Sequence, residues 1–149
     1  MNNKCLDAFI DKLQEDILSE AYRAYGKKGY ERWLKPKFCN TITDPDTHAT
    51  LTGECGDTME IFLCMDGEKV SDASYRTNGC ASSSICGSFA AEMVIGKSAD
   101  EILDMTGNTI LNELGRFPKE EQHCAHLAIT TVKEAINKYM REKSLRPEI

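Results

Sequence analysis

The 149-residue sequence has no apolar run long enough to cross a membrane, which takes about 18 to 20 consecutive apolar residues. Basic residues are also few, with 18 Lys and Arg against 24 Asp and Glu and a formal charge of −6. A net negative charge opposes binding to nucleic-acid phosphates. The first residues lack a signal peptide's apolar stretch and carry acids instead: Asp7, Asp11, Glu15 and Asp16. We therefore expect a soluble, cytoplasmic protein with no membrane or nucleic-acid partner.

The sequence has seven cysteines but no Cys-x-x-Cys pair. Structural zinc sites usually contain ligand pairs two to four residues apart, so the absence of such pairs argues against one. An odd number of cysteines without an export signal also argues against a disulfide framework. Any site made of cysteines must therefore be assembled by the fold from residues far apart in the sequence.

The first half of the chain predicts one helix and a β-hairpin. Apolar residues recur at three- and four-residue steps over 3–25, which predicts an amphipathic helix that ends at Gly26. Residues 27–50 are rich in Pro, Asp, Thr and Asn, a composition typical of an irregular connection. The segments 59–65 and 70–77 flank Asp66-Gly67 and predict a hairpin.

The second half predicts helices. Ser82 to Ser84 favour a helix start and Gly96 follows its expected end at Ile95, while Ser98 and Glu101 have capping-box spacing. Short helical pieces follow through Leu114. Apolar residues on one stripe over 123–141 predict a core-packed helix. Strands first and helices after them indicate an α+β domain, with helices over one face of a small antiparallel sheet.

Three cysteines lie at predicted element boundaries. Cys55 sits between glycines and two residues before Asp57, in a loop suited to binding a ligand. Cys80 and Cys124 each precede or open a helix, where free amides and the helix dipole favour a thiolate. His123 adjoins Cys124 and can bind metal or carry a proton.

The other four cysteines, Cys5, Cys39, Cys64 and Cys86, have no ligand-like neighbours. Cys64 and Cys86 lie among apolar residues, and free cysteine is often buried as a small hydrophobe. We expect these two to pack in the core.

Three motifs resemble the IscU/NifU N-terminal family of iron-sulfur scaffolds: Gly53-Glu54-Cys55-Gly56-Asp57, Asp72 to Cys80, and His123-Cys124-Ala125 with Leu127-Ala128. The resemblance runs from about Tyr30 to Tyr139 and includes Gly96-Lys97-Ser98. It implies a three-stranded antiparallel sheet with helices packed over it. We expect one scaffold domain over 1–149, with a helical extension at 1–29, an IscU-like core at 30–141, and no further NifU domains.

The resemblance also implies roles for the site residues. Cys55, Cys80 and Cys124 would bind an iron-sulfur cluster, a 2Fe-2S cluster with 4Fe-4S as the alternative. Asp57 would be a labile oxygen ligand, His123 an alternative fourth ligand, and Cys124 the acceptor of persulfide sulfur. Three thiolates with one oxygen or nitrogen can release a cluster more readily than four thiolates. Zinc suits the same ligands in the apo form.

The implied partners are a cysteine desulfurase, apo iron-sulfur proteins, an electron donor such as ferredoxin, and a second copy of the chain. The family's chaperone-binding Leu-Pro-Pro-Val-Lys segment is replaced here by Phe117 to Gln122, with Glu121 in place of a lysine. The resemblance therefore does not extend to an Hsp70-type chaperone. Two alternatives stay open: a zinc-dependent persulfide carrier of the SufU kind and a Cys-His thiol enzyme. The short interval from Cys80 to Cys124 argues against the SufU kind.

Overall fold

A computed structural model describes residues 3–145 as an α+β fold built on a three-stranded antiparallel sheet. The strands are β1 (Thr47–Thr52), β2 (Thr58–Asp66) and β3 (Lys69–Thr77), in the order β1-β2-β3. Ile61 on β2 pairs with Ala49 on one side and with Tyr75 on the other. The expected hairpin of β2 and β3 is therefore confirmed, and so are the three antiparallel strands that the family resemblance implied.

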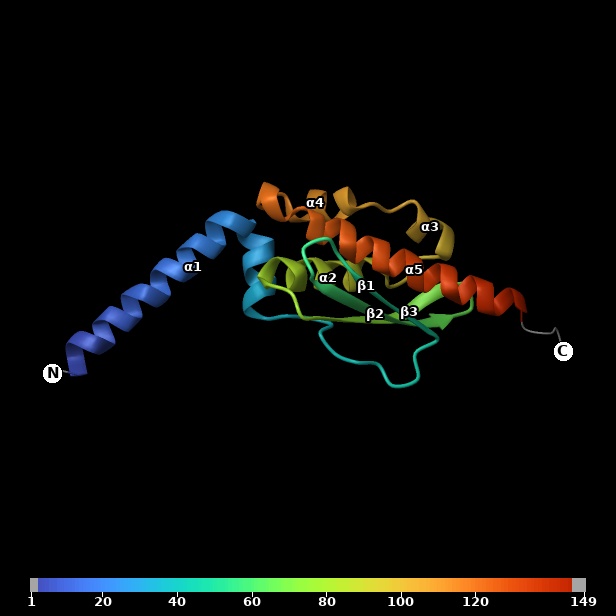
Figure 1. Ribbon diagram of the computed structural model, residues 1–149, viewed down its shortest axis with the longest axis horizontal. Helices are drawn as coiled ribbons and strands as arrows, with labels where there is room; N and C mark the ends of the chain where they lie inside the picture. The colour runs from blue at the N-terminus through green and yellow to red at the C-terminus, as the bar shows by residue number, and fades with distance from the viewer. Residues whose placement is uncertain (1–2, 146–149) are drawn as a thin grey trace.

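Helices follow the sheet in the sequence and cover one of its faces (Figure 1). They are α2 (Ala81–Val94), α3 (Ala99–Leu103), α4 (Gly107–Leu114) and α5 (His123–Leu145), with a 3-10 turn at Lys119–Glu121 before α5. Helix α2 packs on β3, α5 packs on β1 and β2, and the two helices pack on each other. The segment before β1 runs along the opposite side of the sheet in Figure 1.

The core lies between the sheet and helices α2 and α5. Met59, Ile61 and Leu63 alternate along β2 and are fully buried, as period-two side chains facing helices should be. Ala128, Val132 and Ile136 on α5 are likewise fully buried, which confirms the predicted core-packed stripe. The Ser98–Glu101 capping box at the start of α3 is also present.

The predicted helix does stop at Gly26, but the prediction of an irregular connection from residue 27 was wrong, because a second helical piece follows the kink. Helix α1 spans Asn3–Leu34 and changes direction at Gly26, whose φ of 73° lies in the left-handed region that glycine tolerates. After the kink, a second helical piece packs on α2, so the irregular connection begins only after Leu34. Before the kink, Tyr25 packs against the core, but the apolar residues from Leu6 to Ile17 are exposed, and this part of α1 projects away from the body (Figure 1).

Arg32 holds the second piece of α1 on α2. Its side chain is 9% exposed and donates to Ser88 Oγ at 2.9 Å and to Glu92 Oε2 at 2.6 Å. The guanidinium also lies 4.2 Å from the ring centroid of Phe89, a cation-π distance. A buried arginine is tolerated here because its charge is paired and its donors find acceptors.

Two further predictions were wrong in detail. Residues Thr47–Thr52 form β1 and are not part of the irregular connection, because their inward side chains, such as Thr47 and Ala49, are small or polar and mask the strand pattern. The N-cap of α2 is Cys80, not one of the serines. Ser82 and Ser83 lie inside the first turn and are fully buried.

No helix within residues 3–145 is long and apolar enough to cross a membrane. Residues 1, 2 and 146–149 of the expected 1–149 domain lie outside the described part of the chain.

Gly87 tests the packing of α2 on the sheet. A Cβ at this position would lie 2.6 Å from Cδ2 of Tyr75 and 3.1 Å from Sδ of Met59. In an exposed helix interior, Gly→Ala stabilises by about 1 kcal/mol, but we expect Gly87→Ala to destabilise by about 1–3 kcal/mol through overpacking. Urea unfolding measures the change. Asn112→Ala, on the exposed face of α4, is the control and should be neutral or slightly stabilising. A stabilised Gly87→Ala would contradict this packing.

Candidate functional site

Cys55 lies at the tip of the tight turn that joins β1 and β2. Gly53 N–H donates to Asp57 O at 2.8 Å and Gly56 N–H donates to Gly53 O at 3.0 Å. Gly56 has a φ of 89°, which a side chain would disfavour. These bonds bend the backbone around residues 53–57, so Cys55 is exposed while Asp57 points back toward the body.

Cys80 lies at the junction of β3 and α2 and is exposed. The turn before it is fixed by two side-chain contacts: Thr58 N–H donates to Asn78 Oδ1 at 2.7 Å, and Gly79 N–H donates to Thr77 Oγ1 at 3.0 Å. A Cβ on Gly79 would lie 2.9 Å from Cγ of Asp57. Glycine is therefore required at position 79 for this turn to approach the Asp57 carboxylate.

Cys124 lies in the first turn of α5 and is buried. The Ser83 hydroxyl lies 2.9 Å from Asp57 Oδ2 and 3.5 Å from Cys124 Sγ, within hydrogen-bond reach of both. A hydroxyl carries one proton, so Ser83 donates to one of these two groups at a time. Ser83 thus links the β1–β2 turn to the starts of α2 and α5.

Burial raises the pKa of the Cys124 thiol to about 11. The Ser83 hydrogen bond acts in the opposite direction, and the charges of Cys80, Asp57 and Cys55 raise the pKa further. At neutral pH Cys124 is therefore a neutral thiol, and a nearby cation is needed to favour its ionised form.

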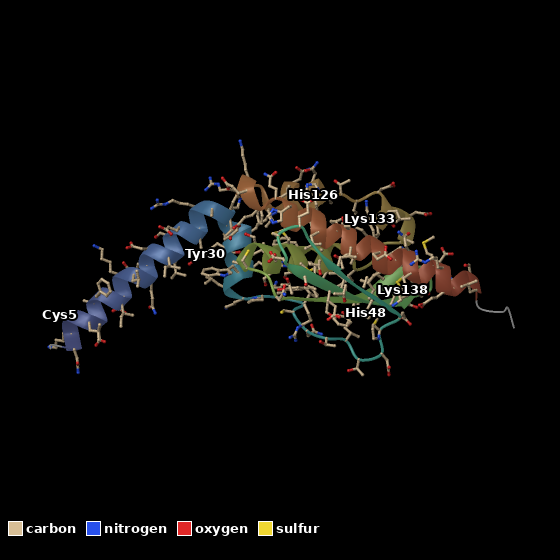
Figure 2. The ribbon with its side chains drawn as sticks, viewed as in Figure 1. Cys5, Tyr30, His48, His126, Lys133 and Lys138 are labelled. Carbon is tan, nitrogen blue, oxygen red and sulfur yellow. The ribbon has the colours of Figure 1, made fainter. Side chains whose placement is uncertain are left out.

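His123 is exposed at the start of α5 and shares a surface depression with Cys55, formed by the end of β1, the β1–β2 turn and one side of α5. His126 lies one turn further along α5 (Figure 2) and lines the same depression. Its ring also packs against Gly107 of α4, where a Cβ would collide with it. The structure therefore brings Cys55, His123 and His126 to one surface.

Sequence reasoning missed a second polar cluster beside the thiols. Ser82 Oγ donates to Glu121 Oε2, and the Tyr25 hydroxyl lies 2.9 Å from Ser82 Oγ and 3.3 Å from the same carboxylate oxygen. Burial raises the pKa of Tyr25, and the charges of Glu121 and Cys80 act in the same direction. A run of three serines that begins two residues after Cys80 was the available signal for Ser82 and Ser83. Glu121, noted in the sequence only as a departure from the family, connects α1, α2 and the start of α5.

The remaining cysteines are not part of this site. Cys5 lies at the far end of α1 (Figure 2), and Cys39 is exposed beside Tyr75. Cys86 is fully buried, and burial raises its thiol pKa well above the usual value, so its packing role is confirmed. Cys64 is only partly buried because it follows the inward-facing Leu63 and so lies on the other face of β2, and the expectation of a core position was wrong.

Three thiols, one carboxylate and one imidazole are a donor set that fits iron-sulfur clusters and zinc. Across residues 3–145, however, no three His, Cys, Asp or Glu side chains are already placed to hold a metal ion. Cys124 is buried, Cys55 and Cys80 are exposed, and Asp57 is within hydrogen-bond reach of Ser83. Ligand binding therefore requires side chains of this site to move.

Comparison with known proteins identifies the family. Residues 24–145 match the family described as NifU-like N terminal domain. Iron-sulfur cluster assembly scaffold protein IscU 1 of Archaeoglobus fulgidus is 32% identical over 119 residues, which cover 79% of this chain and 78% of the relative. The chain therefore belongs to the IscU/NifU N-terminal family of iron-sulfur cluster assembly scaffolds.

Solved structures agree on the fold. The N-terminal part of a NifU-like protein from Brucella abortus superposes with a TM-score of 0.65 at 23% identity, over 81% of this chain and 97% of the other. A SUF-system scaffold from Fervidobacterium islandicum AW-1 gives 0.62 at 22% identity, over 78% and 98%. At these identities the likeness concerns the fold alone.

The burial of Cys124 predicts a pH dependence of stability. Its folded-state pKa of about 11 lies above the usual 9.0, so folding favours the protonated thiol. The contribution of this pKa difference to the free energy of unfolding is complete below about pH 9 and is lost as the pH rises toward 11. We expect wild type to lose more stability than Cys124→Ala between pH 8 and pH 10.5, measured by urea unfolding under reducing conditions. Cys5→Ala, which removes a distant thiol, should follow wild type. Parallel curves for wild type and Cys124→Ala would contradict the buried thiol.

Proposed function

We propose that this protein is a scaffold on which an iron-sulfur cluster is assembled and then passed to apo-proteins, with Cys55, Cys80 and Cys124 as thiolate ligands. The carrying observation is that Ser83 contacts both Asp57 and Cys124, while the charges of Cys55 and Cys80 act on the same thiol. Membership of the scaffold family supports the same function. In this proposal the cluster is cargo and the protein is not an enzyme.

Asp57 is proposed as the labile ligand, with His123 as the alternative. Thiolates are the soft ligands that iron-sulfur clusters prefer, and a carboxylate oxygen holds iron less firmly. When the Asp57 carboxylate leaves the iron, its oxygen can accept a hydrogen bond from the Ser83 hydroxyl instead. An iron site with three firm ligands and one exchangeable ligand can both hold and release a cluster.

Cys124 is proposed as the sulfur acceptor. Its thiolate attacks the outer sulfur of a persulfide on a cysteine desulfurase, an S–S bond forms on Cys124, and the donor cysteine leaves as a thiolate. The thiol proton has a route through Ser83 to Asp57. Conversion of the resulting Cys124 persulfide to sulfide takes two electrons, which an electron donor of the ferredoxin type provides. Because Cys124 is buried, its reaction with the donor persulfide requires the β1–β2 turn or the start of α5 to move first.

We propose a 2Fe-2S cluster, because three thiolates and one further ligand provide two donors for each of two iron ions. A 4Fe-4S cluster is the alternative outcome of reconstitution, and zinc in the apo form suits the same donors.

Cysteine variants distinguish ligands from packing residues. Replacing Cys55, Cys80 or Cys124 by Ser should abolish the cluster reconstituted anaerobically from iron and sulfide. Cys86→Ser is the control: its hydroxyl would be buried without a partner, at a cost of about 1–3 kcal/mol, but no ligand is removed. Iron and sulfide content and thermal melting are measured on all four variants. A cluster that survives loss of Cys55, Cys80 or Cys124, or that needs Cys86, would require a different ligand set.

Asp57→Ala should slow cluster transfer and prolong the life of the bound cluster, because the exchangeable ligand is gone. Transfer to an apo-ferredoxin is followed by circular dichroism. Asp66→Ala, in the distant turn between β2 and β3, should transfer at the wild-type rate. Faster transfer from Asp57→Ala would show that Asp57 does not promote release.

A zinc-dependent sulfur carrier of the SufU kind is the second candidate, because the donor set also suits zinc and a SUF-system scaffold shares the fold. Metal content of the purified protein and its activity with a desulfurase separate the two. A protein that retains zinc, accelerates the desulfurase and forms no cluster would establish the carrier. Cluster formation after zinc removal would establish the scaffold.

A further inference from the structure

The first part of α1 exposes an unusual amount of apolar surface. We call residues 3–25 the N-terminal arm; at about 1.5 Å per residue it is about 35 Å long and projects from the body (Figure 1). Six large apolar side chains of the arm are between 42% and 65% exposed: Tyr22 and, closer to the N-terminus, Leu6, Phe9, Ile10, Leu13 and Ile17. We call the five residues from Leu6 to Ile17 in this set the apolar stripe.

The apolar stripe occupies one side of the arm. At 100° per residue its members fall within about 100° of one another around the helix axis, so they form one continuous ridge. Leu6, Ile10, Leu13 and Ile17 follow the four-three-four spacing that places side chains at the seam of a two-helix coiled coil. The opposite side is charged or small, with Lys4, Asp7, Ala8, Asp11 and Glu15.

The family match begins at residue 24, close to the kink at Gly26. The arm therefore precedes the part of the chain that the family shares. Isolated helices of this length are marginal in water, and most helical stability comes from packing of an apolar face. An arm with an unpacked stripe accordingly needs a surface to cover it.

We propose that the apolar stripe pairs with the same stripe of a second copy of this chain, forming a weak, reversible dimer through the two arms. The seam spacing fits a helix of the same kind as the partner. Only five partly exposed side chains of each copy enter the interface, so the area that pairing buries is small compared with a standard specific interface. An interface of this size fits a transient dimer and not a permanent one.

The charge of the arm disfavours an anionic membrane as the alternative occupant. Membrane-surface helices are typically rich in Lys and Arg on the polar face. The arm has five acidic residues against three basic ones: Asp7, Asp11, Glu15, Asp16 and Glu20 against Lys4, Lys12 and Arg23. This proposal does not depend on the proposed scaffold function.

Sedimentation of the full-length protein over about 1 to 200 µM, the range suited to a small interface, tests the proposal. Wild type should shift from monomer to dimer across this range, with a rise in helix content by circular dichroism. Leu13→Glu, which keeps helix propensity but places a charge in the stripe, should stay monomeric. Ser19→Glu adds the same charge on the other side of the arm, where Ser19 is exposed, and should dimerise like wild type. Both variants should melt at the wild-type temperature.

Each contrary result would overturn the proposal. Wild type that stays monomeric throughout has no self-pairing stripe. If Leu13→Glu dimerises like wild type, the dimer forms through another surface. If Ser19→Glu also fails to dimerise, the added charge and not the stripe explains the loss. Monomeric wild type that binds vesicles of phosphatidylcholine and phosphatidylglycerol would assign the stripe to a membrane surface instead.

Discussion

The contact of the Ser83 hydroxyl with Asp57 and Cys124 is the interaction on which the site depends. It joins a turn between two strands to the starts of two helices that are far apart in the sequence. Each residue reaches this point for a local reason: Asp57 closes the Gly53 turn, Ser83 lies in the buried first turn of α2, and Cys124 opens α5. The packing of α2 and α5 on the sheet therefore sets the positions of the proposed ligands.

The same packing explains why the site as described is closed to metal. Burial keeps Cys124 protonated, and the Asp57 carboxylate accepts a hydrogen bond from Ser83. A bound cation reverses the balance, because positive charge favours both the thiolate and the carboxylate. The neighbouring Tyr25, Ser82 and Glu121 cluster connects the end of the N-terminal arm to this region.

Local patterns in the sequence predicted much of the fold. The hairpin of β2 and β3, the Ser98–Glu101 capping box and the buried stripe of α5 depend on residues close in sequence, and all are present. Errors arose where distant contacts decide the outcome. Residues 27–34 are helical and pack on α2, and β1 forms because β2 offers it a partner despite its polar sequence.

The candidate site was predictable only in part. Cys55, Cys80, Cys124, Asp57 and His123 follow from short motifs and the family they resemble, and their roles remain predictions. Ser83 and Glu121 carry no motif that marks their contacts, because each contact joins residues at least 26 positions apart. Such contacts depend on how the helices pack, which no local pattern in this sequence records.

The most direct test of the scaffold is the iron K-edge X-ray absorption spectrum of the anaerobically reconstituted protein. A cluster at this site predicts a short iron–iron distance, sulfur as the dominant neighbour and a minor oxygen or nitrogen contribution, which Asp57→Ala reduces if Asp57 is the fourth ligand. Iron surrounded only by oxygen and nitrogen, with no second iron nearby, would contradict the account.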